Sequence, residues 1–345
     1  MKLRVYFSIN ISIHRDHTTV EHDKKPTKPV TVSSLGFSAY AYEEIEQTRK
    51  RHQHSTASNY GTAMRSFMKF NKERDVPLVD INSELIDAYG EWLLKNKVSK
   101  DTLSCYMRSL RALYNKAVKQ GCVRQCNPFC NVFTGISRTR KRSVEKGDIC
   151  KLQKAILKPG SFMCLVRDVF LFCFYACGMP FIDVAFLKKE QLEEGFMTYN
   201  RRKTNQPVRI KLEPCMQAII NRYISDDREY VFPFLSSLND DLAYKEYQQK
   251  MSNYNKTLKK LGEKVGICRT LSSYVPRHTW ATLAFRSAAD LLVVSQALGH
   301  TDTRTTRIYV KDIGSNKQDT VNKELLNGIV GILPLYKSSN SQISK

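Results

Sequence analysis

Long apolar segments are missing from this sequence. The most apolar stretch, residues 169–176, is far too short to span a bilayer, and Arg167 and Asp168 come directly before it. Residues 1–14 alternate like a β-strand and lack the unbroken apolar run and small-residue cleavage site of a secretory signal. We therefore expect no membrane partner and a cytoplasmic location, in which cysteines stay reduced.

Cysteine pairs with the spacing of a metal site are also missing. Cys122, Cys126 and Cys130 recur every four residues, but no matching second pair follows, and Pro128 interrupts the run. Structural zinc is held by four ligands, which usually come as two closely spaced pairs. We expect ordinary thiols, no metal site and no cofactor.

Acidic residues are too few to balance the basic ones. The 345-residue chain has 33 Asp and Glu against 55 Lys and Arg, which gives a net charge of +22. Self-repulsion of this size is tolerated mainly when the partner is a polyanion, and nucleic acid is the commonest one. Apolar residues make up 42% of the chain, so two or three domains with buried cores are expected.

Changes in composition divide the chain into five segments. Residues 1–34 end in a stretch rich in Lys, Pro, Thr and Ser, and form either a tail or a remnant arm that touches nucleic acid. Helical periodicity fills residues 35–121, and a basic linker follows at 122–143. Residues 144–326 form a second, larger domain, and 327–345 form a C-terminal tail.

Two groups of basic residues flank the boundary between the domains. The last helix of the first domain carries Arg108 and Arg111 on its outer side, which is either a solvated face or a surface that contacts phosphates. The linker holds the densest basic cluster of the chain, formed by Arg138, Arg140, Lys141 and Arg142. We interpret both groups as binding the phosphate backbone.

The second domain contains one short strand-like region among helical patterns. Residues 197–199 and 208–210 have the composition of two strands joined by a basic tip. The tip carries Lys203 and also Arg201 and Arg202, which we interpret as contacts to a nucleic-acid backbone. The predicted fold class is mainly α with a small β-sheet (α+β).

The residues with the clearest chemical pattern lie near the end of the second domain. Gly299 ends a predicted helix directly before His300, and Tyr309 follows nine residues later. Upstream, the run from Tyr274 to Thr282 contains Arg277 and leads into another helix.

In order, Lys203, Arg277, His300 and Tyr309 lie in four motifs that resemble those of the tyrosine recombinase (phage integrase) family. The resemblance is closest to a branch of bacterial integrases and invertases, and it covers nearly everything after residue 35. It implies a helical core-binding (SAM-like) domain followed by a tyrosine-recombinase catalytic domain. It also implies double-stranded DNA as partner, a homotetramer on that DNA, and accessory DNA-bending or directionality proteins.

The resemblance assigns a role to each site residue. Tyr309 would attack the scissile phosphorus and form a 3′-phosphotyrosine, while Arg277 would brace the phosphate. Lys203 would protonate the leaving 5′ oxygen. His300 would either hydrogen-bond a phosphate oxygen or help to orient the site. Tyr274 would donate a hydrogen bond from a position where the family commonly has histidine.

One arginine of the family pattern is missing. It is expected at Pro180 or, in some relatives, at Cys177, whereas Asp183 matches the acidic residue that buttresses an arginine. Loss of a preorganised transition-state donor costs on the order of hundreds-fold in rate. The sequence leaves open which residue replaces it, the candidates being Arg167, Arg201 and Arg202.

Three functions are compatible with these residues. The first is a site-specific recombinase that integrates, excises or inverts DNA. The second is a type IB-like topoisomerase with the same phosphotyrosine chemistry, which the small helical domain before the catalytic one disfavours. The third is a catalytically weakened member of the family that occupies DNA sites without cutting them, and the missing arginine is its support.

Neutralising the linker cluster tests whether the linker lies on DNA. Each phosphate contact releases counterions, so the logarithm of affinity falls linearly with the logarithm of salt concentration. Exchanging Arg138, Arg140, Lys141 and Arg142 for Gln is expected to make this slope shallower by several units at most. Fluorescence anisotropy of a labelled duplex over a salt series measures the slope. An unchanged slope would show that the linker does not contact DNA.

Overall fold

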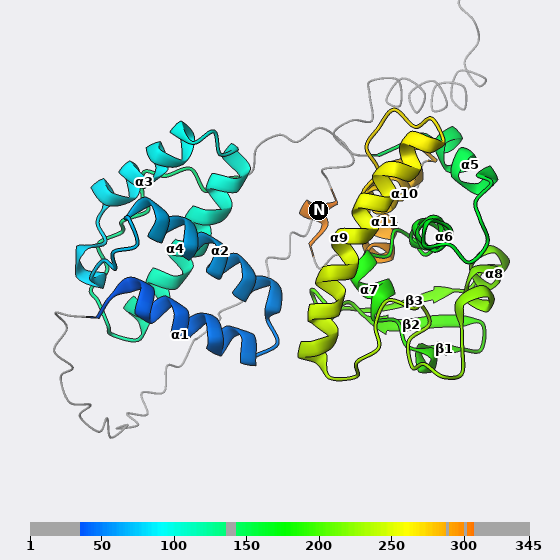
Figure 1. The fold of residues 1–345 in the computed structure, drawn as a ribbon, viewed down its shortest axis with the longest axis horizontal. Helices are drawn as coiled ribbons and strands as arrows, with labels where there is room; N and C mark the ends of the chain where they lie inside the picture. Colours follow the sequence, from blue (N-terminus) through cyan, green and yellow to red (C-terminus); the bar gives the residue numbers. More distant parts are fainter. Residues whose placement is uncertain (1–34, 136–142, 288–289, 300–301, 307–345) are drawn as a thin grey trace, which may run out of the picture. The chain divides into compact units, whose positions relative to one another are not determined.

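The computed structural model describes residues 35–135, 143–287, 290–299 and 302–306. The chain forms two compact units that divide after Ser137, each described here by itself (Figure 1). The linker cluster and both predicted tails lie outside the described residues. Among the helices of the described ranges, none has the length and apolar character that crossing a membrane requires.

The first unit is a bundle of α-helices with one short 3₁₀ turn. Its elements are α1 (Phe37–Lys50), α2 (His54–Phe70), η1 (Leu78–Asp80), α3 (Ser83–Lys95) and α4 (Lys100–Lys119). Helix α2 packs against both α1 and α4. Its buried Phe67 meets Tyr89 of α3 edge to face, with ring centroids 5.3 Å apart. The predicted helical domain is therefore confirmed.

Local sequence signals set the ends of these helices. The side chain of Asn82 caps α3 by accepting a hydrogen bond from the Leu85 N–H at 2.9 Å, and Ser99 caps α4 in the same way. The first core continues beyond Gly121, where the sequence placed the start of the linker, because Val123 and Phe129 are buried in it.

The second unit combines helices with one small sheet. Its helices are α5 (Lys146–Lys154), α6 (Phe162–Tyr175), α7 (Phe181–Ala185), α8 (Pro214–Tyr223), α9 (Asp240–Lys264), α10 (Val275–Arg286) and α11 (Leu291–Ala297), with 3₁₀ turns η2 (Lys189–Gln191) and η3 (Thr303–Thr305). The sheet is antiparallel in the order β1 (Leu192–Glu193), β2 (Phe196–Asn200), β3 (Pro207–Lys211). The pair β2–β3 is the predicted hairpin, in which Tyr199 lies opposite Val208. The fold class, mainly α with a small β-sheet, is confirmed.

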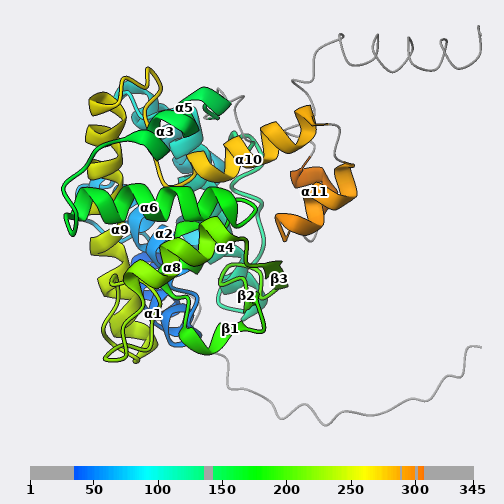
Figure 2. The same ribbon diagram turned by 90° about the vertical axis from the view of Figure 1, so that its right-hand side faces the viewer.

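Helix α6 lies at the centre of the second unit. Helices α5, α8, α9 and α10 all pack against it, and Figure 2 shows it passing between them. Its nearly continuous apolar sequence explains this position, because a helix that is apolar on all sides must be buried on all sides. Helix α7 is fixed to α9 by Phe181, whose ring stacks on Tyr254 with centroids 4.1 Å apart.

Helices α10 and α11 form a smaller apolar cluster of their own. It contains Phe285 of α10 and Val294 of α11. The two helices pack against each other, as Figure 2 shows. The cluster is tied to the rest of the unit by Thr279, whose Oγ1 accepts the Val144 N–H at 3.1 Å. After α11, the buried hydroxyl of Thr306 donates to Ser295 at 3.1 Å, which holds the following turn against the helix.

The cap of α3 predicts a measurable loss on mutation. Asn82→Ala removes the side-chain acceptor and is expected to cost about 1 kcal/mol in helix stability. Ser83→Ala, one residue further on, is the matched control, because its side chain is not the capping acceptor of α3. Amide hydrogen exchange across α3 measures both variants, and equal protection in the two would contradict the capping role.

Candidate active site

Three segments that lie far apart in the sequence meet around Arg277. They are the turn after α6, the residues that follow β2, and the end of α11. Arg277 lies in the first turn of α10, and its side chain is 4% exposed. Its Nη1 donates to the carbonyl of Gly178 at 3.0 Å, and its Nη2 donates to the carbonyl of Leu298 at 2.6 Å.

This placement of Arg277 is costly. The positive end of a helix dipole lies at the N-terminus and repels a cation, and burial removes the cation from water. Two carbonyl acceptors offset part of the cost and fix the plane of the guanidinium. An arginine held in this way is preorganised, which is the property that an anion-binding group requires.

Gly178 is required for the close contact between the turn after α6 and α10. Its φ is +74°, and a Cβ at this position would lie 2.8 Å from the Cα of Arg277. The residue before it, Cys177, also has a positive φ of 53° and is half-buried, and burial raises the pKa of its thiol. Pro180, two residues after Gly178, occupies the N-cap position of α7 without a side-chain hydrogen bond.

Asp183 joins α7 to the hairpin. Its carboxyl is buried, and Oδ1 accepts the backbone N–H of Arg202 at 2.9 Å, while Oδ2 lies 3.9 Å from Nε of Arg201. Burial raises the pKa of Asp183, against the opposing effects of the Arg202 N–H and of the charges on Arg201 and Arg277. The ion pair with Arg201 agrees with the predicted buttressing role, and the hydrogen bond fixes the start of the hairpin tip.

Arg201 points into the protein rather than outward from the hairpin tip. Its side chain is buried, and Nη1 donates to the carbonyl of Gly299 at 2.5 Å. Gly299 has φ +61°, and a Cβ there would lie 2.6 Å from Cδ of Arg201. Arg201 and Arg277 thus bind two consecutive carbonyls, those of Gly299 and Leu298, directly before His300.

The remaining tip residues are exposed, as the sequence predicted. Arg202 forms an ion pair with Asp240 at 2.5 Å, and its guanidinium lies 3.8 Å from the ring centre of Phe186. Lys203 is exposed in the turn between the strands. Tyr274 is the N-terminal cap residue of α10, three residues before Arg277, and is 45% exposed.

Two of the predicted catalytic residues, His300 and Tyr309, lie outside the described residues. The structure therefore brings together Arg277, Asp183 and the base of the hairpin that carries Lys203, and it does not test the other two. In the first unit, Arg108 is exposed on α4 and Arg111 is half-buried. Both stay predictions as phosphate contacts.

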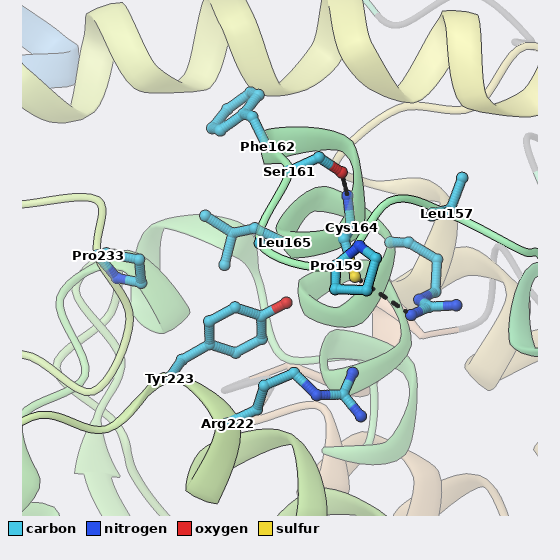
Figure 3. Close-up of a pocket in the computed structure, with 11 residues that line it drawn as sticks. Leu157, Pro159, Ser161, Phe162, Cys164, Leu165, Arg222, Tyr223 and Pro233 are labelled. Carbon is cyan, nitrogen blue, oxygen red and sulfur yellow. Dashed lines mark hydrogen bonds between the residues drawn. The ribbon is translucent and has the colours of Figure 1, made fainter.

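A second candidate region is a cavity of about 850 Å³ beside the N-terminal end of α6 (Figure 3). Arg167 and Arg222 line it, and both form ion pairs of 2.5 Å with the buried carboxylate of Asp168. The hydroxyl of Tyr223 donates to the same carboxylate at 2.7 Å. The polar groups of this cavity satisfy one another, which is the pattern of a structural network.

Burial of Arg201 had a signal in the sequence. Along β2 the buried residues alternate, with Met197 and Tyr199 inside and Thr198 outside, and Arg201 continues the inward phase. The prediction that Arg201 lies on the exposed tip rested on its charge and is wrong. The alternation could have predicted its direction, although not the carbonyl that it binds.

Comparisons with known proteins identify the family of this chain. Residues 36–132 match the phage integrase SAM-like domain, and residues 151–314 match the phage integrase family, so the two matches together cover more than half of the chain. The chain belongs to the tyrosine recombinase (phage integrase) family.

Alignments with two curated relatives cover most of this chain. A tyrosine recombinase of Pseudothermotoga lettingae is 23% identical over 304 residues, which are 85% of this chain and 98% of the relative. Tyrosine recombinase XerD of Shewanella oneidensis is 24% identical over 265 residues, which are 74% of this chain and 85% of the relative.

Among solved structures, the fold is similar to a lambda integrase dimer bound to a COC′ core site, with a TM-score of 0.61 at 14% identity, covering 81% of this chain and 97% of that one. It is also similar to the Tn1549 transposon integrase in complex with transposon right end DNA, with a TM-score of 0.58 at 12% identity, covering 84% and 99%. At these identities the likeness is one of fold.

The close approach of Gly178 to Arg277 predicts a specific loss of stability. Gly178→Ala places a methyl group against the α10 backbone and also strains a positive φ. Gly195→Ala is the matched control, since its φ is +78° and a Cβ there meets nothing within 4 Å. We expect Gly178→Ala to lower the free energy of unfolding by at least about 1 kcal/mol more than the control. Denaturant titration of the second unit measures both, and equal losses would contradict the contact.

Proposed function

We propose that this protein is a site-specific DNA recombinase that cuts and rejoins DNA through a 3′-phosphotyrosine intermediate. The observation that carries the proposal is the buried guanidinium of Arg277, held by two carbonyls at the meeting point of three segments. A fixed, desolvated fork of donors suits the non-bridging oxygens of a phosphodiester. Membership of the tyrosine recombinase family supports the same chemistry.

In the proposed reaction, the hydroxyl oxygen of Tyr309 attacks the scissile phosphorus and displaces the 5′ oxygen of the next nucleotide. The new bond is a 3′-phosphotyrosine, and the broken bond is P–O5′. Tyr309 gives up its hydroxyl proton to water as the new bond forms, and Lys203 donates a proton to the leaving 5′ oxygen. Arg277 and His300 bind the non-bridging oxygens. Attack by the 5′ hydroxyl of another strand reverses the step, so the phosphotyrosine conserves the bond energy and no nucleotide triphosphate is needed.

The position of Lys203 supports its role as acid. The hydrogen bond from the Arg202 N–H to Asp183 fixes the residue before it, and the lysine itself is exposed. An amine in this place can reach a bound strand while its backbone stays anchored to α7. Arg202, Arg108, Arg111 and the linker cluster add positive charge for the phosphates that flank the cut.

We further propose a homotetramer on two DNA sites, because exchange of strands between two duplexes requires four cleavages. Accessory DNA-bending or directionality proteins would decide between integration, excision and inversion. The solved structures with the similar fold are described as bound to a COC′ core site and to transposon right end DNA, which supports DNA as the partner here.

The alternative is a family member that binds sites without cutting them. Cys177 and Pro180, which stand where the family has its first arginine, favour this alternative. A topoisomerase of the IB type would form the same covalent adduct but relax supercoils without joining two sites.

Tyr309→Phe separates these functions. Phenylalanine keeps the aromatic ring and removes the attacking hydroxyl, so the covalent adduct is expected to disappear while DNA affinity stays within a few-fold. The substrate is fragmented chromosomal DNA of the organism that encodes the chain, incubated with wild type or variant in EDTA. Adducts that survive denaturation by detergent are counted and sequenced.

The outcomes differ for each function. Enrichment of one sequence in the wild-type adducts and none with Tyr309→Phe supports a site-specific recombinase. Wild-type adducts without sequence enrichment favour the topoisomerase. Specific DNA binding with no wild-type adduct favours the binding-only protein, and equal adducts from both proteins would show that Tyr309 is not the nucleophile.

A further inference from the structure

Among the described residues, a second guanidinium, that of Arg201, is buried beside Arg277, and the proposed reaction gives it no role. Arg201 enters from the hairpin, and its side chain is 6% exposed, close to the 4% of Arg277. Both bind consecutive carbonyls at the end of α11, Arg277 that of Leu298 and Arg201 that of Gly299. The two cations therefore lie at one turn of the chain, directly before His300.

The donors of Arg201 are only partly used. Nη1 donates to Gly299, whereas Nε is buried and has no hydrogen-bond partner within the described residues. Its carboxylate neighbour, Asp183, is 3.9 Å from Nε, which is too long for a hydrogen bond. The Nε N–H therefore has no acceptor, and it lies on the side of the guanidinium through which arginine binds an oxyanion.

The other candidates for the missing arginine have different surroundings. Arg167 lies eight residues before Tyr175, the last residue of α6, which is about 12 Å along the helix axis. It is also engaged by Asp168 and by the carbonyl of Ala155 at 3.1 Å. Arg202 points to Asp240 and the Phe186 ring. Of the three, Arg201 shares the turn that Arg277 binds.

We infer that Arg201 is the second phosphate-binding arginine of this site, in the place of the arginine that Cys177 and Pro180 do not supply. This inference rests on the proposed function. In the transition state, negative charge gathers on the non-bridging oxygens, and Arg201 binds one of them while Arg277 binds the other. The second arginine of the site then comes from the residue after β2 instead of from the turn after α6.

The experiment compares two scissile groups that differ in charge. The site recovered from wild-type adducts is synthesised as a nicked duplex with either a phosphodiester or a methylphosphonate at the cut position. The methylphosphonate replaces one charged non-bridging oxygen with a methyl group, so its cleavage needs one guanidinium fewer. Adduct formation is then timed for wild type, Arg201→Ala and Arg201→Lys.

The inference predicts a loss that depends on the substrate. On the phosphodiester, Arg201→Ala is expected to be about hundredfold slower than wild type, with Arg201→Lys between them. On the methylphosphonate, Arg201→Ala and wild type are expected to agree within a few-fold. Arg209→Ala, which removes an arginine stacked on Phe196 in the same hairpin, is the matched control and is expected to behave as wild type on both substrates.

Three results would overturn the inference. Equal losses of Arg201→Ala on both substrates would show that the residue only holds the end of α11 in place. An undiminished rate of Arg201→Ala on the phosphodiester would show that it has no role in cleavage. Absence of any adduct with wild type would instead defeat the proposed function, and the inference with it. If Arg201→Ala is unstable, Arg201→Lys serves in its place, because it keeps a buried cation. Cleavage of the methylphosphonate by Arg201→Lys would show that this variant is folded.

Discussion

Burial of the guanidinium groups of Arg201 and Arg277 at one turn constrains everything around them. A buried cation is tolerated only while its hydrogen bonds and its counter-charge stay in place. Here these partners belong to separate segments, namely the carbonyls of Gly178, Leu298 and Gly299. Separating any of these segments would leave a buried guanidinium without its hydrogen-bond acceptors. The cost of doing so keeps the turn after α6, the hairpin and the end of α11 together.

The glycines and Asp183 are explained by the same constraint. Gly178 and Gly299 stand where a side chain would collide with the backbone of Arg277 or with the side chain of Arg201. Asp183 supplies negative charge from α7, which Phe181 fixes to α9 in the main core. Charged groups at the edge of the unit are therefore positioned by apolar packing at its centre.

Local features of the fold were predictable from the sequence, whereas long-range ones were not. The β2–β3 hairpin depends on neighbours a few residues away, and its prediction is confirmed. The cap of α3 by Asn82 is likewise a local feature. The acceptor of Arg201 lies 98 residues further along the chain, so no local pattern indicates it. The roles of His300 and Tyr309 remain expectations from motif order, because order along a chain does not fix distance in space. The predicted phosphate contacts remain expectations from clustered basic charge.

The anchoring of the hairpin determines how quickly Lys203 can move. The Arg201 carbonyl accepts the N–H groups of Thr204 and Asn205 at 3.2 and 2.7 Å, so the turn that contains the lysine is closed by backbone hydrogen bonds. With the Arg202 N–H bound to Asp183 as well, the main chain at this point is fixed on both sides of the lysine. Its amine moves by rotation about side-chain bonds, which for exposed residues takes picoseconds to nanoseconds, rather than by the slower displacement of a loop.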